Sequence, residues 1–313
     1  MPRSAVLGAC GFLGSHLCEV LVAAGHELLA LDEPARVRAP SASQESFPSV
    51  VRGLGVEPLA VEAAPNWRTL LEGVDLLFLS EPERLSRLES ILTDLVGLPL
   101  EVILISDAEV YGPGAVHSEE SLPDPRSRRA RTLIEIEETL ADVGLPHVIL
   151  RPAGVYGPRC LRALREARQR VHLHVGDPRP AAFVHVRDVA RAALHVATSP
   201  RATDRLYNVA DESDLDEDDA LDLLSDLTGH PLVSVDLPPP LARVHARARR
   251  LGGQLLAALP RPRGRAGLPR LDAGRTRCDA TRLRKTGFFL EVPDVSEGLR
   301  DTLTWFRQEG WLG

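Results

Sequence analysis

A glycine-rich turn near the start of the chain constrains the fold more than any other feature. Residues 8–14 read GACGFLG, between a short apolar run at residues 5–7 and a helical pattern at residues 15–24 that ends at Gly25. Glycines in such a turn permit positive φ angles and let the backbone approach a ligand at the N-terminus of the following helix. The order of strand, turn and helix predicts the first unit of a parallel α/β sheet.

An acidic residue follows this turn at a distance that suits a dinucleotide. A second apolar run, residues 26–31, closes at Asp32, and Glu33 comes next. In such a unit an acid about twenty positions past the glycines accepts hydrogen bonds from the adenosine ribose. Because two adjacent carboxylates repel a 2′-phosphate, the pattern favours NAD over NADP. The alternative is a turn that persists as scaffold after its ligand was lost. The predicted cofactor-binding residues are Gly8, Gly11, Phe12, Leu13, Gly14, Asp32, Glu33, Glu62, Leu79 and Ser80.

The composition of the chain limits the classes of partner that it is expected to bind. The 313 residues are 44% hydrophobic and carry a net charge of −7, which argues against a general nucleic-acid or anionic-membrane surface and favours a small-molecule ligand. The chain starts directly in a strand and holds no run near the ~20 apolar residues of a membrane span, so we expect a cytoplasmic protein with no membrane contact. Four scattered cysteines have no metal-ligand spacing, so we predict reduced thiols and no metal site.

Strand-like and helical patterns then alternate, which predicts a Rossmann-like, doubly wound parallel sheet. Past about residue 157 the alternation loosens into a smaller C-terminal α/β substrate lobe. We expect residues 1–157 to form the dinucleotide-binding domain, with 178–200 returning to it, and 158–313 to form mainly the lobe. The expected strands are residues 74–79, 101–106 and 147–151, and the expected helices are 84–96, 130–143, 189–198 and 215–228.

The segment at residues 238–270 differs in composition, because it is rich in arginine and proline around an apolar middle. It is either a solvated amphipathic helix packed on the lobe or a contact for an anionic ligand or protein, since arginine forks suit phosphate.

Five motifs in order resemble the extended short-chain dehydrogenase/reductase family, the NAD-dependent epimerase/dehydratase group. The resemblance covers nearly the whole chain and implies a Rossmann domain, a substrate lobe and substrates that are often nucleotide sugars. The motifs are the GxxGxxG turn, GVDLLF at residues 73–78, ISDAEVYG at 105–112, LRPAGVYGP at 150–158 and FVHVRDVA at 183–190; residues 207–209 (YNV), 297–300 (EGLR), Trp305 and 310–312 (GWL) match the family's C-terminal lobe.

This chain departs from the family's catalytic set. The family uses a tyrosine as acid/base, a lysine that grips the nicotinamide ribose, and a serine or threonine on the substrate oxygen. Counting from the VYG motif places Asp107 on the serine/threonine position, with Ser106 one residue earlier. An ungapped alignment of the next helix places Arg129 on the tyrosine and Leu133 on the lysine.

Other ligand positions also depart from the family. Ser80 and Glu81 replace the small residues usual beside the cofactor, and Gly154 and Ala181 replace an asparagine and an arginine of nucleotide-sugar enzymes. Loss of a positioned acid/base costs ~10²–10⁴ in rate. The adenosine half of the site lies upstream of these changes, so binding without hydride transfer is self-consistent.

Three hypotheses follow, and whether the chain is an enzyme stays open at this point. The first is a pseudoenzyme or regulatory NAD-binding protein. The second is a rewired oxidoreductase, epimerase, isomerase or lyase acting on a sugar or natural-product-like metabolite. The third is an RNA- or protein-binding module. The candidate catalytic residues of the second are Asp107, Tyr111 and Tyr156, with Glu109 and His117 as further acid/base candidates.

The third hypothesis depends on a basic cluster, Arg126, Arg128, Arg129 and Arg131. The acidic total and the lack of interleaved aromatics make nucleic acid an unfavoured partner, and we expect these arginines to pair with Glu119, Glu120, Glu135 and Glu137. The family commonly forms homodimers through two helices per subunit, which implies residues 84–96 and 130–143 here. The leucines at 85, 88, 92 and 95 suit either that interface or the subunit's own sheet.

Overall fold

The computed structural model describes most of the chain outside the arginine-rich segment. The described residues are 1–39, 46–61, 66–84, 88–112, 116–160, 171–174, 182–213, 215, 217–229, 233–236 and 277–312. Glu62, Leu85, Ala181 and residues 238–270, which carried predictions, lie outside these ranges.

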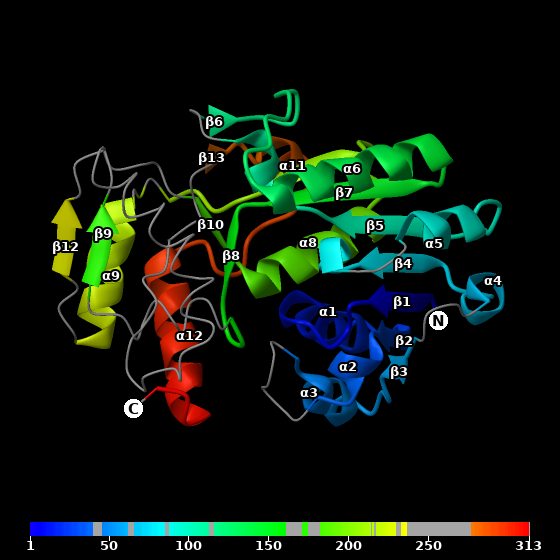
Figure 1. Cartoon of the computed structure of the whole chain (residues 1–313), viewed down its shortest axis with the longest axis horizontal. Coiled ribbons are helices and arrows are strands. Elements are labelled where there is room, and N and C mark those ends of the chain that lie inside the picture. The colour runs from blue at the N-terminus through cyan, green and yellow to red at the C-terminus, as the bar shows by residue number, and fades with distance from the viewer. Residues whose placement is uncertain are drawn as a thin grey trace, which may run out of the picture.

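A seven-stranded parallel sheet forms the body of the molecule (Figure 1). Its order, β11-β7-β5-β4-β1-β2-β3, reverses between β1 and β4, as in a Rossmann sheet. The central strands are buried because helices cover both faces, which explains their nearly continuous apolar sequence. The strands are β1 (Arg3–Leu7), β2 (Glu27–Asp32), β3 (Leu59–Ala60), β4 (Leu76–Leu79), β5 (Glu101–Ile105), β7 (His147–Pro152) and β11 (Leu206–Val209).

Two hydrophobic clusters join the sheet to its helices. On one face, α1 (Phe12–Ala23), α3 (Pro48–Gly53) and α8 (Val186–Thr198) pack on the sheet. On the other face lie α4 (Trp67–Leu70), α5 (Leu88–Asp94) and α6 (Arg128–Val143). The doubly wound α/β architecture expected from the sequence is therefore confirmed.

Several helix boundaries differ from the expected ones: α6, α8 and α9 begin at Arg128, Val186 and Glu217 instead of at residues 130, 189 and 215. The first helix begins at Phe12, inside the glycine turn, because Gly11 is the extended N-cap and the residues after it are already helical. The helix expected over residues 84–96 is shorter, since Pro82–Arg84 form a 3₁₀ turn, η1, before α5, and Gly97 turns the chain with φ +83°. Short segments near a proline or a glycine are where helical periodicity predicts ends least well.

The remaining elements form short parallel ribbons and terminal helices (Figure 1). β8 (Gly154–Tyr156) pairs with β10 (Phe183–His185), β9 (Val171–His174) with β12 (Val233–Asp236), and β6 (Val116–His117) with β13 (Arg277–Cys278). Helices α9 (Glu217–Thr228) and α12 (Val295–Gln308) pack against each other around Leu224, Leu303 and Phe306. The shorter elements are α2 (Pro34–Val37), η2 (Ala108–Tyr111) and α11 (Thr281–Lys285).

The leucines of α5 face the subunit's own sheet. Leu88, Leu92 and Leu95 are buried in the cluster that also holds Ile136 and Leu140 of α6. The sequence left open whether these leucines form a dimer interface or pack on the sheet of the same chain, and the structure shows that they pack on that sheet. The exposed residues of α6 are mostly charged, among them Arg131, Glu135, Glu138 and Asp142.

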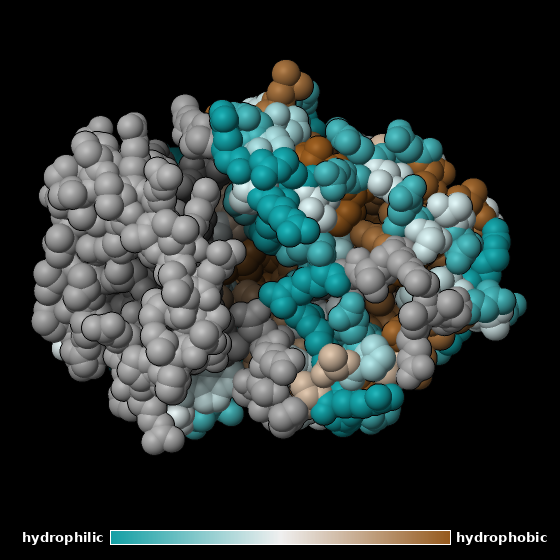
Figure 2. All heavy atoms as spheres, in the orientation of Figure 1, coloured by the Kyte–Doolittle hydropathy of each residue, from teal (hydrophilic) through white to brown (hydrophobic). Residues whose placement is uncertain are grey.

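Over the described residues of the face in Figure 2, hydrophilic side chains are interspersed with smaller hydrophobic areas. Within the described ranges, we find no helix that combines the length and the apolar character needed to cross a membrane. All four cysteines are buried.

Candidate dinucleotide site and the replaced catalytic positions

The candidate site lies where the carboxyl ends of β1, β2 and β4 meet. The order of the sheet reverses between β1 and β4, and ligands of open α/β sheets bind in the crevice at such a switch point. The glycine turn follows β1, Asp32 ends β2, and Ser80 follows β4. The turn and the acidic residue predicted from the sequence are therefore neighbours in space.

Packing of the turn on itself requires two of the three glycines. Gly8 has φ +89°, and a Cβ there would overlap the carbonyl oxygen of Ser80. A Cβ on Gly14 would overlap the carbonyl oxygen of Gly8. These contacts are with backbone, which cannot yield without moving a strand or the start of α1.

Gly11 has a different role, because a Cβ there would meet only the ends of two side chains. It would lie 2.7 Å from Arg36 Nη1 and 2.7 Å from Glu81 Oε2. The backbone does not need a glycine at this position, whose φ is −71°. Gly11 instead keeps open the space above the turn, where a phosphate can approach the backbone N–H groups.

Asp32 is 1% exposed and fixes the end of β2 to the turn. Its Oδ2 accepts a hydrogen bond from the Cys10 N–H at 2.8 Å, and its Oδ1 accepts one from the Glu33 N–H at 2.7 Å. Burial raises the pKa of Asp32, against the opposing effects of the Arg36 charge and of both N–H groups. Glu33 is the N-cap residue of α2.

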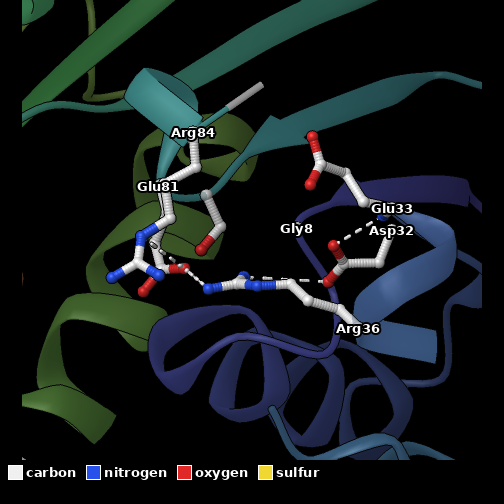
Figure 3. A pocket seen from close by; sticks show the side chains of 7 residues that line it. Gly8, Asp32, Glu33, Arg36, Glu81 and Arg84 are labelled. Carbon is white, nitrogen blue, oxygen red and sulfur yellow. Dashed lines mark hydrogen bonds and ion pairs between the residues drawn. The ribbon is translucent and has the colours of Figure 1, made fainter. Parts of the chain in front are cut away.

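Three charged side chains lie across the mouth of this site (Figure 3). Arg36 Nη2 is 2.6 Å from Glu81 Oε2, and Arg36 Nη1 is 3.9 Å from Asp32 Oδ2. Arg84 Nε is 3.8 Å from the same Glu81 oxygen. Together with Gly8, Glu33 and Ser80 they line a pocket of about 190 Å³.

The other predicted cofactor residues surround the turn at different depths. Leu13 and Leu79 are buried in the two cores on opposite faces of the sheet, and Phe12 is half-buried beside His16. Ser80 is fully buried and lines the pocket.

Sequence reasoning missed Arg36 and Arg84 as members of this pocket. Arg36 follows Asp32 by four residues, a helical spacing, but α2 is only one turn long and has no hydrophobic periodicity that would predict it. Arg84 follows Glu81 by three residues, a spacing that brings side chains together on a helical turn, but nothing in the sequence linked Arg36 to Glu81.

Carboxylates surround Arg129, the residue that the sequence alignment predicts at the family's tyrosine position. Arg129, in the first turn of α6, places Nη1 2.6 Å from Asp107 Oδ2 and Nε 2.7 Å from Glu83 Oε1. Glu109 Oε2 is 3.7 Å from the same Nη1. Burial alone would lower the pKa of Arg129, but Asp107 and Glu83 raise it. Arg129 and Asp107, both candidate site residues, are therefore joined to each other by an ion pair.

Asp107 lies two residues past the end of β5, and protein groups hold its carboxylate from two sides. Its Oδ1 accepts a hydrogen bond from the Glu109 N–H at 2.8 Å as the cap of η2, while its Oδ2 faces Arg129. Ser106, one residue earlier, donates its hydroxyl to Glu137 Oε1 at 2.5 Å. Glu137 also holds a buried ion pair with Arg151 at 2.5 Å.

Leu133, which the alignment predicts at the family's lysine position, is fully buried. It lies in a cluster with Val110, Tyr111 and Ala130, behind the Arg129 ion pair. None of the residues in that cluster carries a positive charge.

Tyr111 is 1% exposed, and its hydroxyl donates to Asn208 Oδ1 at 2.8 Å. Its ring stacks on His117 with centroids 5.2 Å apart, and the Arg151 guanidinium lies 4.7 Å from the ring centroid. Burial raises the pKa of Tyr111, although Arg151 and Asn208 oppose the effect. Its ring and hydroxyl are both engaged by protein groups.

Tyr156 contrasts with Tyr111, because its hydroxyl is buried and makes no hydrogen bond within the described part of the chain. The ring meets His185 edge to face at 5.5 Å and packs in the lobe cluster with Phe183 and Val295. Burial and the nearby carboxylates, Asp211 first among them, raise the pKa of Tyr156.

The predicted partners of the basic cluster were wrong. Arg129 pairs with Asp107 and Glu83, and Arg126 pairs with Asp124. The expected partners have other contacts: Glu119 and Glu120 face Arg282, and Glu137 faces Arg151, because tertiary packing and not distance along the chain decides which charges meet. Glu135 shares no ion pair with this cluster among the described residues.

A second missed group ties the segment after β8 to α1. Arg159 has φ +71° and forms a two-pronged ion pair with Glu19, at 2.6 and 2.9 Å. His16 accepts from the same guanidinium, and its Nε2 lies 3.0 Å from the Pro158 carbonyl oxygen. This cluster fixes the loop that follows the VYGP motif beside the glycine turn's helix.

Comparisons with known proteins place this geometry in a family. The model of the NAD dependent epimerase/dehydratase family matches residues 5–67 and 88–210. The match covers more than half of the sequence, so the chain belongs to this family. The expected assignment to the extended short-chain dehydrogenase/reductases is confirmed.

Individual relatives are distant. The chain is 26% identical over 226 residues to the chloroplast stem-loop binding protein of 41 kDa b from Arabidopsis thaliana, a match that spans 66% of this chain and 58% of that protein. It is 24% identical to a UDP-N-acetyl-alpha-D-glucosaminuronate decarboxylase from Bacillus cytotoxicus, with 98% of each covered. UDP-glucuronic acid 4-epimerase from Bacillus cereus, solved in complex with NAD, superposes with a TM-score of 0.73 at 19% identity over 98% of this chain and 99% of that one.

Proposed function

We propose that this protein binds NAD at the glycine turn and acts as a regulatory or scaffold protein that does not carry out the family's hydride chemistry. The observation that carries the proposal is the Arg129–Asp107 ion pair at 2.6 Å, which ties up the two positions of the tyrosine and the serine or threonine. A guanidinium is protonated at every physiological pH and cannot serve as the general acid/base that a tyrosine provides.

The residues expected to hold the adenosine half of NAD are present, which supports binding of the cofactor. The turn keeps its three glycines, and Asp32 stands at its rim where a ribose hydroxyl can reach a carboxylate. Several solved structures of the same fold, such as the Bacillus cereus epimerase, contain NAD. Glu33 lies beside Asp32, and its charge disfavours the 2′-phosphate of NADP.

The lack of a lysine for the nicotinamide ribose supports the proposal that the bound cofactor is not turned over. Leu133 offers no charge for the nicotinamide ribose, and each charge-assisted hydrogen bond lost with the lysine costs roughly 1.5–3 kcal/mol. We therefore expect a bound dinucleotide that is weaker than in active relatives and is not reduced.

For the rest of the chain we propose the ranges of the domains, a class of ligand and a dimer interface. Residues 1–157 with 178–200 form the dinucleotide-binding unit, and the lobe accepts a small molecule, for which a nucleotide sugar is one class because relatives are named for UDP sugars. Gly154, in place of an asparagine, removes one such contact. A homodimer through α5 and α6 would have to use their polar outer faces, since Leu88, Leu92 and Leu95 are buried.

A rewired enzyme is the second candidate, and the Tyr156 hydroxyl favours it. Asp107 and Tyr111 both have protein partners, whereas the hydroxyl of Tyr156 is buried without a hydrogen bond among the described residues. Such an unpaired group is a candidate for proton transfer to a metabolite. A Tyr156→Phe variant that loses an activity detected in the wild type would favour this reading.

An RNA-binding role has support in the name of the Arabidopsis relative. Arg126 and Arg129 are already paired with carboxylates, which weakens the basic cluster as a phosphate surface. A gel shift with structured RNA at low salt tests this role, and the absence of any shift would exclude it.

The test of the proposed function is a calorimetric titration of ligand-free protein with NAD⁺ and separately with NADP⁺. Mass spectrometry of the denatured protein first checks for dinucleotide that co-purifies. We expect NAD⁺ to bind with micromolar or tighter affinity and NADP⁺ more weakly. If neither binds, the glycine turn is scaffold alone and the proposal is wrong.

A further inference from the structure

The Arg36–Glu81 ion pair occupies the space directly above the glycine turn. A Cβ on Gly11 would lie 2.7 Å from Glu81 Oε2, which belongs to the ion pair, and 2.7 Å from Arg36 Nη1, the other terminal nitrogen of the paired guanidinium. Figure 3 shows the Arg36 and Glu81 side chains directed toward each other. In dinucleotide-binding sheets a glycine at this turn lets the pyrophosphate approach the backbone. The pair therefore lies where a diphosphate would have to be.

The pocket that remains is too small for a dinucleotide. Its lining residues surround only about 190 Å³ of space, and part of that space is open solvent. Its floor consists of backbone and of buried Asp32 and Ser80, which cannot retreat. Of the side chains that line the pocket, Arg36 and Glu81 are the two that a Cβ on Gly11 would meet, so their displacement would make space above the turn.

The contact between them is close but poorly aligned. Arg36 Nη2 and Glu81 Oε2 lie 2.6 Å apart, yet neither buried atom completes a hydrogen bond within the described residues. Glu81 has φ +52°, a left-handed conformation that is uncommon for a residue with a side chain. Strained backbone of this kind clusters at ligand sites.

A diphosphate would satisfy Arg36 better than Glu81 does. The guanidinium presents five N–H donors in a planar fork, and phosphate oxygens match that fork in two-pronged geometry. Glu81 would retain a cation when it gives up Arg36, because Arg84 Nε already lies 3.8 Å from its Oε2.

We propose that Arg36 is a diphosphate-binding residue of the dinucleotide site and that Glu81 competes with the ligand's diphosphate for it. This inference rests on the proposed function, because it assumes that a dinucleotide binds at the turn. Glu81 then sets the affinity of the site: ligand binding requires its displacement, and only a ligand that carries a diphosphate can accomplish it.

The experiment compares wild type, Glu81→Gln, Arg36→Ala and the control Glu89→Gln by calorimetry with NAD⁺, ADP-ribose and adenosine. Glu89 is exposed on α5, so its variant removes the same charge outside the pocket. We expect Glu81→Gln to bind NAD⁺ and ADP-ribose about tenfold more tightly than wild type and Arg36→Ala to bind them about tenfold more weakly. Adenosine, which lacks the diphosphate, should bind all variants alike.

The gain of affinity keeps the test independent of folding, because an unfolded variant does not bind more tightly. If wild type binds NAD⁺ and Glu81→Gln binds it no better than Glu89→Gln does, the competition is overturned while the proposed function stands. If no variant binds NAD⁺, both fall. Binding by Glu81→Gln alone supports the competition.

Discussion

The guanidinium of Arg129 lies 2.6 Å from the carboxylate of Asp107, although 22 residues separate them along the chain. The sequence alignment predicts these residues at the positions of the family's tyrosine and its serine or threonine. Without Arg129, the Asp107 carboxylate would face Glu83 and Glu109 in a partly buried site, which costs free energy. Arg129 is therefore the cation that offsets the charge of these carboxylates.

The ion pair predicts a measurable coupling. Arg129→Leu should destabilise the fold by about 1–2 kcal/mol, because Asp107, Glu83 and Glu109 then face one another without a cation. In a double-mutant cycle, Asp107→Asn should recover about half of that loss. Urea unfolding at low and high salt measures both values. Additive effects would show that the pair contributes nothing, and exposed Arg128→Leu serves as the control.

A second prediction concerns the lysine position. Leu133→Lys should destabilise the ligand-free protein by about 3 kcal/mol or more, because Leu133 is fully buried among apolar side chains. The matched variant Leu133→Met should cost less than about 1.5 kcal/mol. When Arg129→Tyr is combined with Leu133→Lys, we expect NAD⁺ to raise the melting temperature more than in wild type. An equal or smaller shift would mean that this helix is misaligned with the family.

Substitution of the last glycine of the turn, Gly14, and of the middle one, Gly11, should have different effects on stability and on NAD⁺ binding. Gly14→Ala should destabilise the fold by about 2–3 kcal/mol, because its Cβ overlaps the Gly8 carbonyl oxygen. Gly11→Ala should cost less than about 1 kcal/mol, since it displaces only the ends of the Arg36 and Glu81 side chains, but it should abolish NAD⁺ binding. Urea unfolding paired with calorimetry distinguishes the two. The reverse order of stabilities would contradict the packing described here.

The stability of the protein should fall as the pH rises from about 4 to 6 through Asp211. Burial raises the pKa of this carboxyl to about 6, against hydrogen bonds from Ser213. The folded state therefore holds a proton that the unfolded state has released, and ionisation above pH 6 disfavours folding. Asp211→Asn should be more stable than wild type by about 1 kcal/mol at pH 8 and equal to it at pH 4.

Asp279→Asn is the matched control, because this substitution should lower the stability of the fold at neutral pH where Asp211→Asn raises it. Hydrogen bonds from Thr281 lower the pKa of Asp279, so its charge stabilises the fold at neutral pH and that contribution is lost as the pH falls below about 4. Thermal melts of both variants across pH 4–8 test the pair. If both shift stability in the same direction, the assignment to Asp211 is wrong.

Local sequence features predicted the parts of the fold that depend on neighbours along the chain. The strand, glycine turn, helix and Asp32 lie within 30 residues of one another, so their relation follows from spacing alone. A helix over residues 130–143 was also predicted; in the structure, α6 begins two residues earlier, after its N-cap Ser127, and ends at Gly144 with φ +74°. The order of the sheet then placed the turn beside Ser80.

Contacts between distant segments could not be predicted in the same way. Arg129 meets Glu83 across 46 residues, and Arg36 meets Glu81 across 45, with no periodic pattern that joins them. Proximity along the chain suggested Glu135 and Glu137 as partners of the arginines, but Glu137 lies on the buried side of α6 against Arg151. Which charges meet depends on how η1, η2 and α6 pack.

The central claim, NAD binding without hydride transfer, is tested most directly by single-turnover absorbance at 340 nm. Protein loaded with stoichiometric NAD⁺ is mixed with UDP-glucuronic acid and, separately, with UDP-glucose, and the sugars are then analysed by mass spectrometry and NMR. The account predicts bound NAD⁺, no reduced cofactor and unchanged sugars. Formation of NADH, or of an epimerised or decarboxylated sugar by the wild type, would contradict it.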